Sequence, residues 1–295
     1  MSDFVLSCCS TADLTKERLD KRNIHYIYFH FILGGVEHED DLWQSMKPED
    51  LYSRMLAGAS AKTSQVTVDE YLTYFESLLK EGKDVLHICF SSGLSGSYNS
   101  ALIAQKELAA RYPERKLYVV DSLAASSGYG LFMETLADLR DEGKNIDELR
   151  DWAENNKLRL HHWFFSTDLT FYVRGGRVSK VSGLIGSILK ICPLLNVDKE
   201  GRLKPREKVR TKNKVMERIV QKMEEHAENG HDYTGKCFLC QSVCEEDAKA
   251  VADHIAKLFP KMNGKPEIFP IGATIGSHTG PGTVAVFFWG DERKN

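Results

Sequence analysis

Residues 85–109, VLHICFSSGLSGSYNSALIAQKELA, predict a buried strand that runs through a Ser/Gly turn into a helix. Val85–Phe90 is a continuous apolar run, as in a strand covered on both faces, and helical periodicity follows from Ser100. The turn at 91–97 places hydroxyl groups and glycines at the helix N-terminus, where unpaired N–H groups and the helix dipole favour an anion. The alternative is that these serines only cap the helix, because serine is a preferred cap residue.

The same order of strand, loop and helix recurs along the first half of the chain. Residues 4–8 and 117–121 are short apolar runs, and 122–143 is a helix whose Ser, Ala and Gly content permits close packing on a sheet. A further strand is expected at 160–165. This alternation predicts an α/β domain over residues 1–165, layered around a mainly parallel sheet, and such sheets bind ligands at the C-terminal ends of their strands.

A small appendage is expected at about 24–60, within this domain. Residues 26–40 have a hairpin pattern that turns at Gly34 and Gly35. Thr67 and Glu70 then form a capping-box start for a helix, so KTSQ at 62–65 should be a loop just before that helix.

From residue 166 the pattern changes to that of an α+β domain, which we expect to extend to residue 295. Two domains imply a cleft between them, and we expect the ligand tunnel there. The predicted elements of this half are short helices at 167–173 and 181–189, a hairpin at 193–210 turning at 199–201, helices at 213–228 and 245–258, and strands at 236–241, 266–276 and 283–289.

Composition excludes several classes of protein. The 295 residues carry a net charge of −3, without the basic excess of a nucleic-acid-binding protein. The chain has neither a cationic segment followed by an apolar core nor a run of 18 apolar residues, so a cytoplasmic protein is expected. Seven cysteines, with Cys8 and Cys9 adjacent, indicate reduced thiols in a reducing compartment.

The motifs of common enzymes are absent. Cys237, Cys240 and Cys244 have a spacing that could suggest a metal, but a fourth ligand is missing and GKCFLCQSV is typical of a core strand, so no metal is expected. GHDYTGKC at 230–237 departs from a phosphate-binding loop at its last position, and no cofactor is expected. Around Ser95 the second glycine of a nucleophile elbow is misplaced.

One enzymatic alternative stays open. A serine, His278 and an unidentified acid could be brought together by the fold as the triad of a serine hydrolase acting on acyl substrates, since triads are recognised by geometry. His278 could equally do no more than support the glycine-rich turn GSHTGPG in which it lies.

Several distant segments together resemble the DegV family of bacterial fatty-acid-binding proteins, in order and spacing over nearly the whole chain. The combination of KTSQ, SSGLSG, GGR and a late HTGPG is specific. The matching segments are SCCSTADL (7–14), AKTSQVT (61–67), SSGLSGSYNSA (91–101), VDSLAASSGYG (120–130), YVRGGRVSKVSGLIGSILKICPLL (172–195), REKVRTKNK (206–214) and IGSHTGPGTVAVFF (275–288).

The resemblance implies a carrier that is not itself an enzyme. Such proteins hold a long-chain fatty acid in a tunnel between two domains and present its carboxylate to a separate ATP-using fatty acid kinase. The apolar segment GLIGSILKICPLL (183–195) would line the tunnel, or could be ordinary core. The ligand-binding residues that the resemblance implies are Thr63, Ser95 with Ser92 as its neighbouring alternative, Gly96, one of Arg174 and Arg177, His278 and Thr279.

Basic residues recur at every other position from Lys204 to Lys214. Such a run is usually a solvated face. The resemblance makes it a candidate docking surface for the kinase, with Arg206 and Arg210 as its central residues, and a transient membrane contact is a further possible partner. The chain departs from the family in lacking a proline after Gln65 and in having Cys8 where an Asp often stands, which leaves acyl chain length and unsaturation open.

Overall fold

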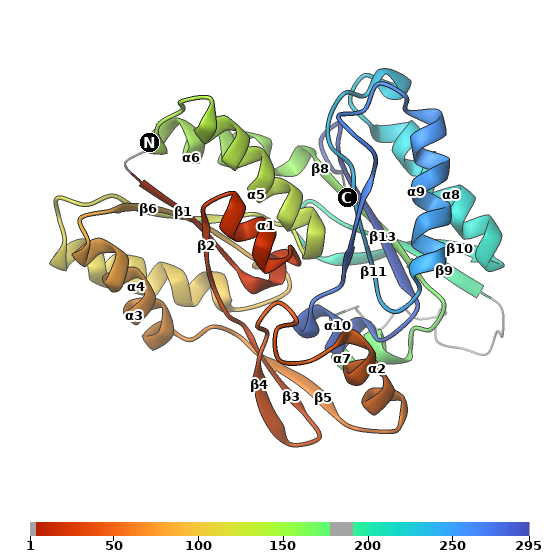
Figure 1. Cartoon of the computed structure of the whole chain (residues 1–295), viewed down its shortest axis with the longest axis horizontal. Coiled ribbons are helices and arrows are strands. Elements are labelled where there is room, and N and C mark those ends of the chain that lie inside the picture. Colours follow the sequence, from red (N-terminus) through yellow and green to blue (C-terminus); the bar gives the residue numbers. More distant parts are fainter. Residues whose placement is uncertain (1–3, 178–190, 295) are drawn as a thin grey trace.

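The first sheet of the computed structural model, which describes residues 4–177 and 191–294, is parallel throughout. Its strand order is β2-β1-β6-β7, and the two central strands are buried along nearly their whole length because helices cover both faces (Figure 1). The predicted α/β class is confirmed. The strands are β1 (Phe4–Cys9), β2 (Ile24–Ile27), β6 (Asp84–Cys89) and β7 (Leu117–Asp121).

Helices α3 and α4 pack side by side on one face of this sheet, with α5 and α6 on the other (Figure 1). Helix α3 begins as predicted, since Thr67 and Glu70 form a complete capping box. The helical elements of this half are η1 (Ser10–Ala12), α1 (Lys16–Lys21), α3 (Val68–Lys80), α4 (Ser97–Arg111), α5 (Ser126–Asp141), α6 (Ile146–Asn156) and η2 (Lys157–Arg159).

Helix α5 joins the two halves, because it also packs on strands of the second sheet. Two of its glycines allow this close approach. A Cβ atom at Gly128 would lie 2.5 Å from Cδ1 of Phe287, and one at Gly130 would lie 2.6 Å from the carbonyl oxygen of Ala12. The small residues that predicted close packing of this segment therefore lie where any side chain would collide.

The second sheet has six strands in the order β10-β9-β8-β13-β11-β12, antiparallel except for β11 and β12. Strand β8 belongs here, so our assignment of 160–165 to the parallel sheet was wrong. The division of the chain at residue 165 stays a prediction. The elements are β8 (Leu160–Ser166), β9 (Ile191–Val197), β10 (Leu203–Arg210), β11 (Phe238–Gln241), β12 (Glu267–Pro270), β13 (Thr283–Trp289), α8 (Lys212–His226), η3 (Gly230–Asp232) and α9 (Glu245–Leu258).

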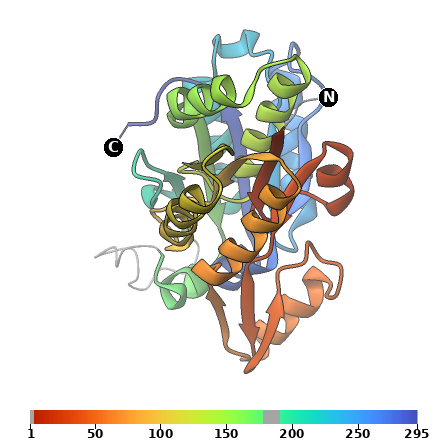
Figure 2. The ribbon, with the colours of Figure 1, turned by 90° about the vertical axis from the view of Figure 1, so that its left-hand side faces the viewer.

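A small third sheet, with order β4-β3-β5, lies at one end of the molecule below the two larger sheets (Figures 1 and 2). It packs with three short helices around Phe31, Tyr52 and Phe171. The elements of this region are β3 (His30–Leu33), β4 (Val36–Glu39), β5 (Ala61–Ser64), α2 (Pro48–Leu56), α7 (Thr170–Gly175) and α10 (Ala273–Thr279).

Three expectations for this end of the molecule need correction. The hairpin predicted at 26–40 is confirmed over β3 and β4, which turn at Gly34 and Gly35, but residues 26 and 27 belong instead to β2, which pairs with β1 in the parallel sheet. Residues 61–64, which include most of KTSQ, form an edge strand instead of a loop, since they pair with β3. The strand predicted at 266–276 ends at Pro270, and α10 follows it.

The predicted helix at 181–189 lies outside the described residues. Among the residues that are described, no helix is long and apolar enough to cross a membrane.

Candidate ligand-binding cavity

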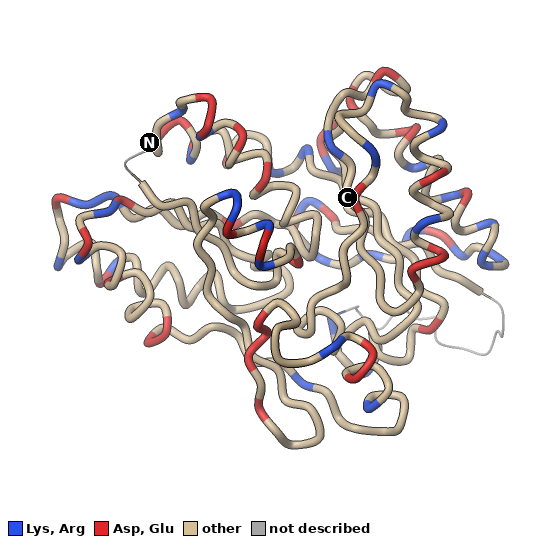
Figure 3. Tube along the Cα trace, viewed as in Figure 1, with Lys and Arg blue, Asp and Glu red and all other residues tan. Residues whose placement is uncertain are grey.

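A cavity of about 470 Å³ lies between the parallel sheet and the six-stranded sheet. Its body is apolar, because the strands that face it carry aromatic and aliphatic side chains and no charged residue on β11 or β13 (Figure 3). Residues of β5 in the small sheet and of α10 line one end of the cavity. The apolar lining residues are Phe29, Phe90, Leu94, Ala125, Phe164, Val197, Leu203, Ile271, Ile275, Ala285 and Phe287.

Thr63 and His278 meet at the polar end of this cavity. Thr63 Oγ1 and His278 Nε2 are 2.7 Å apart, a hydrogen bond between edge strand β5 and the last turn of α10. The pairing of Thr63 with Phe31 in β3 fixes the threonine in register, so the small sheet determines where its hydroxyl lies. Two residues separated by more than 200 positions are thereby brought to one point.

His278 is a neutral imidazole at pH 7 in this arrangement. Burial lowers its pKa to about 4, and the positive charge of Arg177 acts in the same direction. The ring also lies against the backbone of Gly175, where a Cβ atom would be only 2.5 Å from Nδ1. A glycine is therefore required at this position of α7. His278 lies in a helix and not in the glycine-rich turn that the sequence suggested.

The N-terminus of α4 forms the opposite side of the polar end. Ser95 and Gly96 line the cavity, and Gly96 is the residue that precedes the first helical position. A Cβ atom at Gly96 would lie 2.2 Å from Oε1 of Gln65, whose Nε2 donates a hydrogen bond of 3.0 Å to Ser100 Oγ. Gln65 thus connects the KTSQ segment to α4 directly, a role that sequence reasoning missed although the residue lies within a quoted motif.

Of the remaining predicted ligand residues, two line the cavity and two do not. Thr279 lines the cavity, and so does Arg177, whose Nη1 donates a hydrogen bond of 2.7 Å to the carbonyl oxygen of Gly175. Arg174 does not line the cavity and lies over the ring of Phe171 at 5.7 Å. Ser92 is exposed and also lies outside the lining. The described geometry therefore favours Arg177 over Arg174 and Ser95 over Ser92.

Asp40 holds the helix that carries His278, and nothing in the sequence marks it among its acidic neighbours. Its two carboxylate oxygens accept hydrogen bonds from the backbone N–H groups of Ala273 and Thr274, at 3.3 and 3.0 Å. Asp40 is buried, as is Asp13, whose carboxylate accepts a hydrogen bond from the cavity residue Ser126. Burial raises the pKa of both acids, and the charge of Asp40 raises that of Asp13 further.

The hydrolase alternative finds no support in these contacts. Among the described residues, the hydrogen bond between a serine and a histidine is that of Ser7 with His87, 2.9 Å long and fully buried in the parallel sheet. His278 is bonded to Thr63 instead. Among the described residues, Cys237, Cys240 and Cys244 do not form a group of candidate metal ligands. Cys240 Sγ lies 3.2 Å from Ser126 Oγ, and Cys244 Sγ lies 3.2 Å from the Thr283 carbonyl oxygen.

The predicted basic stripe lies on edge strand β10. Lys204, Arg206, Lys208 and Arg210 are all exposed, but a bulge between Pro205 and Glu207 shifts the register, so they do not share one face. Leu203, before the bulge, packs on the core that faces the cavity, whereas Val209, after it, packs on the core beneath α8. Arg206 Nε donates a hydrogen bond of 2.7 Å to Asn196 Oδ1, which orients its guanidinium along the sheet. The stripe is thus a surface feature of the second half and no part of the cavity.

The fold and cavity define an α/β protein with an apolar cavity between its two large sheets and polar side chains at one end of that cavity. A family model described as "Uncharacterised protein, DegV family" matches residues 9–291, and a DegV domain-containing protein of Clostridium perfringens is 37% identical over the full length of both chains. The chain belongs to the DegV family.

Solved structures of the family have the same fold. DegV of Bacillus subtilis, described as a fatty acid binding protein, is 25% identical with a TM-score of 0.82, covering 99% of this chain and 100% of that one. The fatty acid kinase B3 protein of Streptococcus pneumoniae, loaded with linoleic acid, is 21% identical with a TM-score of 0.84 and the same coverage. At the level of the family, these descriptions confirm the expectation of a lipid-binding protein.

Proposed function

We propose that this chain is a cytoplasmic carrier that holds a long-chain fatty acid in the cavity between its sheets. The observation that carries the proposal is the Thr63–His278 pair at the polar end of an otherwise apolar cavity of about 470 Å³. A carboxylate accepts about four hydrogen bonds, and Thr63, Ser95, His278 and Arg177 offer donors on three sides of that end. The fatty acids named for family members support this choice of ligand.

The apolar body and the polar end contribute differently to binding. Each CH2 group moved out of water contributes about 0.8 kcal/mol, so a long chain outweighs the head group. A charge-assisted hydrogen bond contributes about 1.5 to 3 kcal/mol and also fixes direction. The body therefore retains the lipid, and the polar end sets where its carboxylate lies.

The proposal extends to a separate fatty acid kinase that phosphorylates the presented carboxylate. The name of the Streptococcus pneumoniae protein supports such a partner. The exposed basic residues of β10, with Arg206 and Arg210 foremost, are the proposed docking surface, because exposed positive charge speeds encounters with an acidic partner.

Mass spectrometry of lipid extracted from the purified native protein tests the proposal. We expect one long-chain fatty acid in nearly equimolar amount, and no turnover of acyl esters. Protein that is free of acyl chains after purification and does not bind added oleate would contradict the carrier function. Rapid ester hydrolysis that is lost in His278→Ala would restore the hydrolase alternative.

A further inference from the structure

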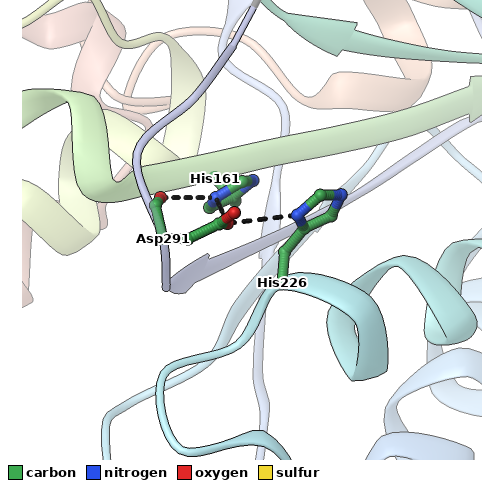
Figure 4. A group of neighbouring side chains, drawn as sticks. All are labelled: His161, His226 and Asp291. Carbon is green, nitrogen blue, oxygen red and sulfur yellow. Dashed lines mark hydrogen bonds and ion pairs between the residues drawn. The ribbon is translucent and has the colours of Figure 1, made fainter.

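A second cluster of polar side chains lies on the face of strand β8 that points away from the cavity. His162 lines the cavity, whereas its neighbour His161 faces α8 on the opposite side of the sheet. There His161 meets His226, the last residue of α8, and Asp291, which follows β13 (Figure 4). Three segments that are distant in the sequence thus place two imidazoles and a carboxylate together.

The three side chains converge on one oxygen atom. His161 Nε2 lies 3.0 Å and His226 Nδ1 lies 3.1 Å from Oδ1 of Asp291 (Figure 4). The carbonyl oxygen of Asp291 is also 2.8 Å from His161 Nε2. All three candidate ligand atoms lie within 4.8 Å of one another. With metal bonds of about 2.0 to 2.2 Å, neighbouring ligand atoms are roughly 3 Å apart, so the two nitrogen–oxygen separations already suit a shared ion, and the group as a whole must draw together slightly to bind one.

The chemistry of the donors selects the kind of ion. Two imidazole nitrogens with one carboxylate oxygen suit zinc and its neighbours among the divalent transition metals, and not magnesium or calcium, which prefer oxygen ligands. Nε2 of His161 lies 2.8 Å from the carbonyl oxygen of Asp291, which can only accept, so this nitrogen carries the hydrogen and must lose it, to Nδ1 or to water, before it can bind an ion. Asp291 supplies the one negative charge among the three candidate ligands.

Binding requires one rearrangement. The rings of His161 and His226 are stacked, with centroids 4.8 Å apart and planes at 18°, so their in-plane lone pairs do not yet point to a common centre. His161 is fixed between this ring and Phe288. His226 is the residue that can turn, because its side chain is 29% exposed and it ends its helix.

We propose that His161, His226 and Asp291 form a binding site for a divalent transition metal such as Zn²⁺. The ion replaces the two hydrogen bonds to the Asp291 carboxylate, with water completing its coordination at the exposed side. It joins β8, α8 and the segment after β13. The site does not include any residue that lines the cavity, so the inference does not depend on the identity of the cavity's ligand.

Zn²⁺ titration of metal-free protein against a chromophoric chelator tests the site, in a Cys244→Ser background that removes the partly exposed thiol. We expect one equivalent of bound Zn²⁺ and a higher Tm in its presence. Asp291→Asn and His226→Gln should each weaken binding about ten-fold or more, a loss that even outer-shell changes can cause. His254→Gln, at an exposed position on α9, is the matched control and should bind like the parent.

Two results would overturn the assignment. One is the absence of Zn²⁺ binding by the parent protein at a several-fold molar excess of metal. The other is equal affinity in the parent, Asp291→Asn and His226→Gln, which would place the ion elsewhere. Near-ultraviolet circular dichroism of each variant without metal verifies folding, and the two variants provide independent tests of the same cluster.

Discussion

The two ends of the cavity are built in different ways. The apolar body lies between strands of the two large sheets, inside the main core, where β13 is bonded on both sides. The polar end is assembled from an edge strand of four residues, a helix of seven, a helix of six and the N-terminus of α4. Its geometry depends on a few hydrogen bonds, such as Thr63 to His278 and Asp40 to the N–H groups of α10. Retention of a ligand and orientation of its head group should therefore be separable by mutation.

The double variant Thr63→Ala, Ser95→Ala should separate retention of the ligand from orientation of its head group most clearly. The double variant loses two head-group donors but keeps the apolar body, so it should retain most of the copurified fatty acid. Acyl-phosphate formation by the kinase should fall about 100-fold, because a displacement of the carboxylate of roughly 1 Å is enough for such a loss. Coupled assays with ATP measure the transfer, and extraction measures the lipid.

Thr73→Ala serves as the matched control for that variant, since Thr73 is exposed on α3 and bonds only to the Asp69 carbonyl oxygen. Full transfer activity in the double variant would show that the anion lies elsewhere, with Arg177 the next residue to change.

Ala285→Phe should have the opposite effect, which is loss of bound fatty acid while the head-group residues are unchanged. Ala285 lines the body from β13, so a larger side chain occupies space that the alkyl chain needs. Displacing about three CH2 groups costs roughly 2.4 kcal/mol, close to a fifty-fold loss of affinity. Fatty acid content should drop while the head-group residues stay in place. Ala110→Phe, at an exposed position of α4, is the control, and undiminished lipid in Ala285→Phe would mean that the chain runs along another path.

A smaller effect at the polar end is expected from Asp40→Ala. The buried N–H groups of Ala273 and Thr274 lose their acceptor, which costs about 1 to 3 kcal/mol of unfolding free energy. Denaturant unfolding measures this loss, and acyl transfer should fall by more than lipid content, because α10 carries His278. Asp40→Asn should recover part of both, whereas Asp41→Ala, at the less buried neighbour, should change neither. If Asp41→Ala lost as much acyl transfer as Asp40→Ala, the loss could not be attributed to the hydrogen bonds that Asp40 accepts from α10.

The parallel sheet and its helices were more predictable from sequence than the polar end of the cavity. Continuous apolar runs such as Val85–Phe90 identify buried parallel strands, and the Thr67–Glu70 capping box marks a helix start, because both signals are local. The edge strand β5 and helix α10 form only because β3 and Asp40 pair with them from elsewhere in the chain. Asp40 accordingly could not be distinguished from the other acids of EHEDD. Thr63 and His278 were reached by resemblance to a family, and not from any spacing between them.

The pKa of His278 reports on the polar end of the cavity separately from its apolar body. Its pKa of about 4 without ligand should rise by about one unit or more when a carboxylate binds beside it, since a negative charge favours the imidazolium. Because the pKa in the folded protein is below the usual value, the neutral ring contributes to stability above about pH 6.5, and this contribution is lost as the pH falls toward 4. NMR of labelled histidines, before and after addition of oleate, measures the pKa, with exposed His254 as internal control. Titration of His278 near 6.5 in ligand-free protein would contradict the buried arrangement.

The smallest effect is expected outside the cavity, at the exposed basic residues of β10. Arg206→Glu or Arg210→Glu should leave fatty acid content unchanged, since neither residue lines the cavity, and should slow phosphorylation of the bound acid several-fold at low ionic strength. The difference should shrink near 1 M salt, where charges are screened within about 3 Å. Lys261→Glu reverses an exposed charge on another surface and should have no effect. Equal phosphorylation rates in all three variants at low salt would mean that the kinase approaches another face, and the comparison between retention and presentation would then rest on the polar end alone.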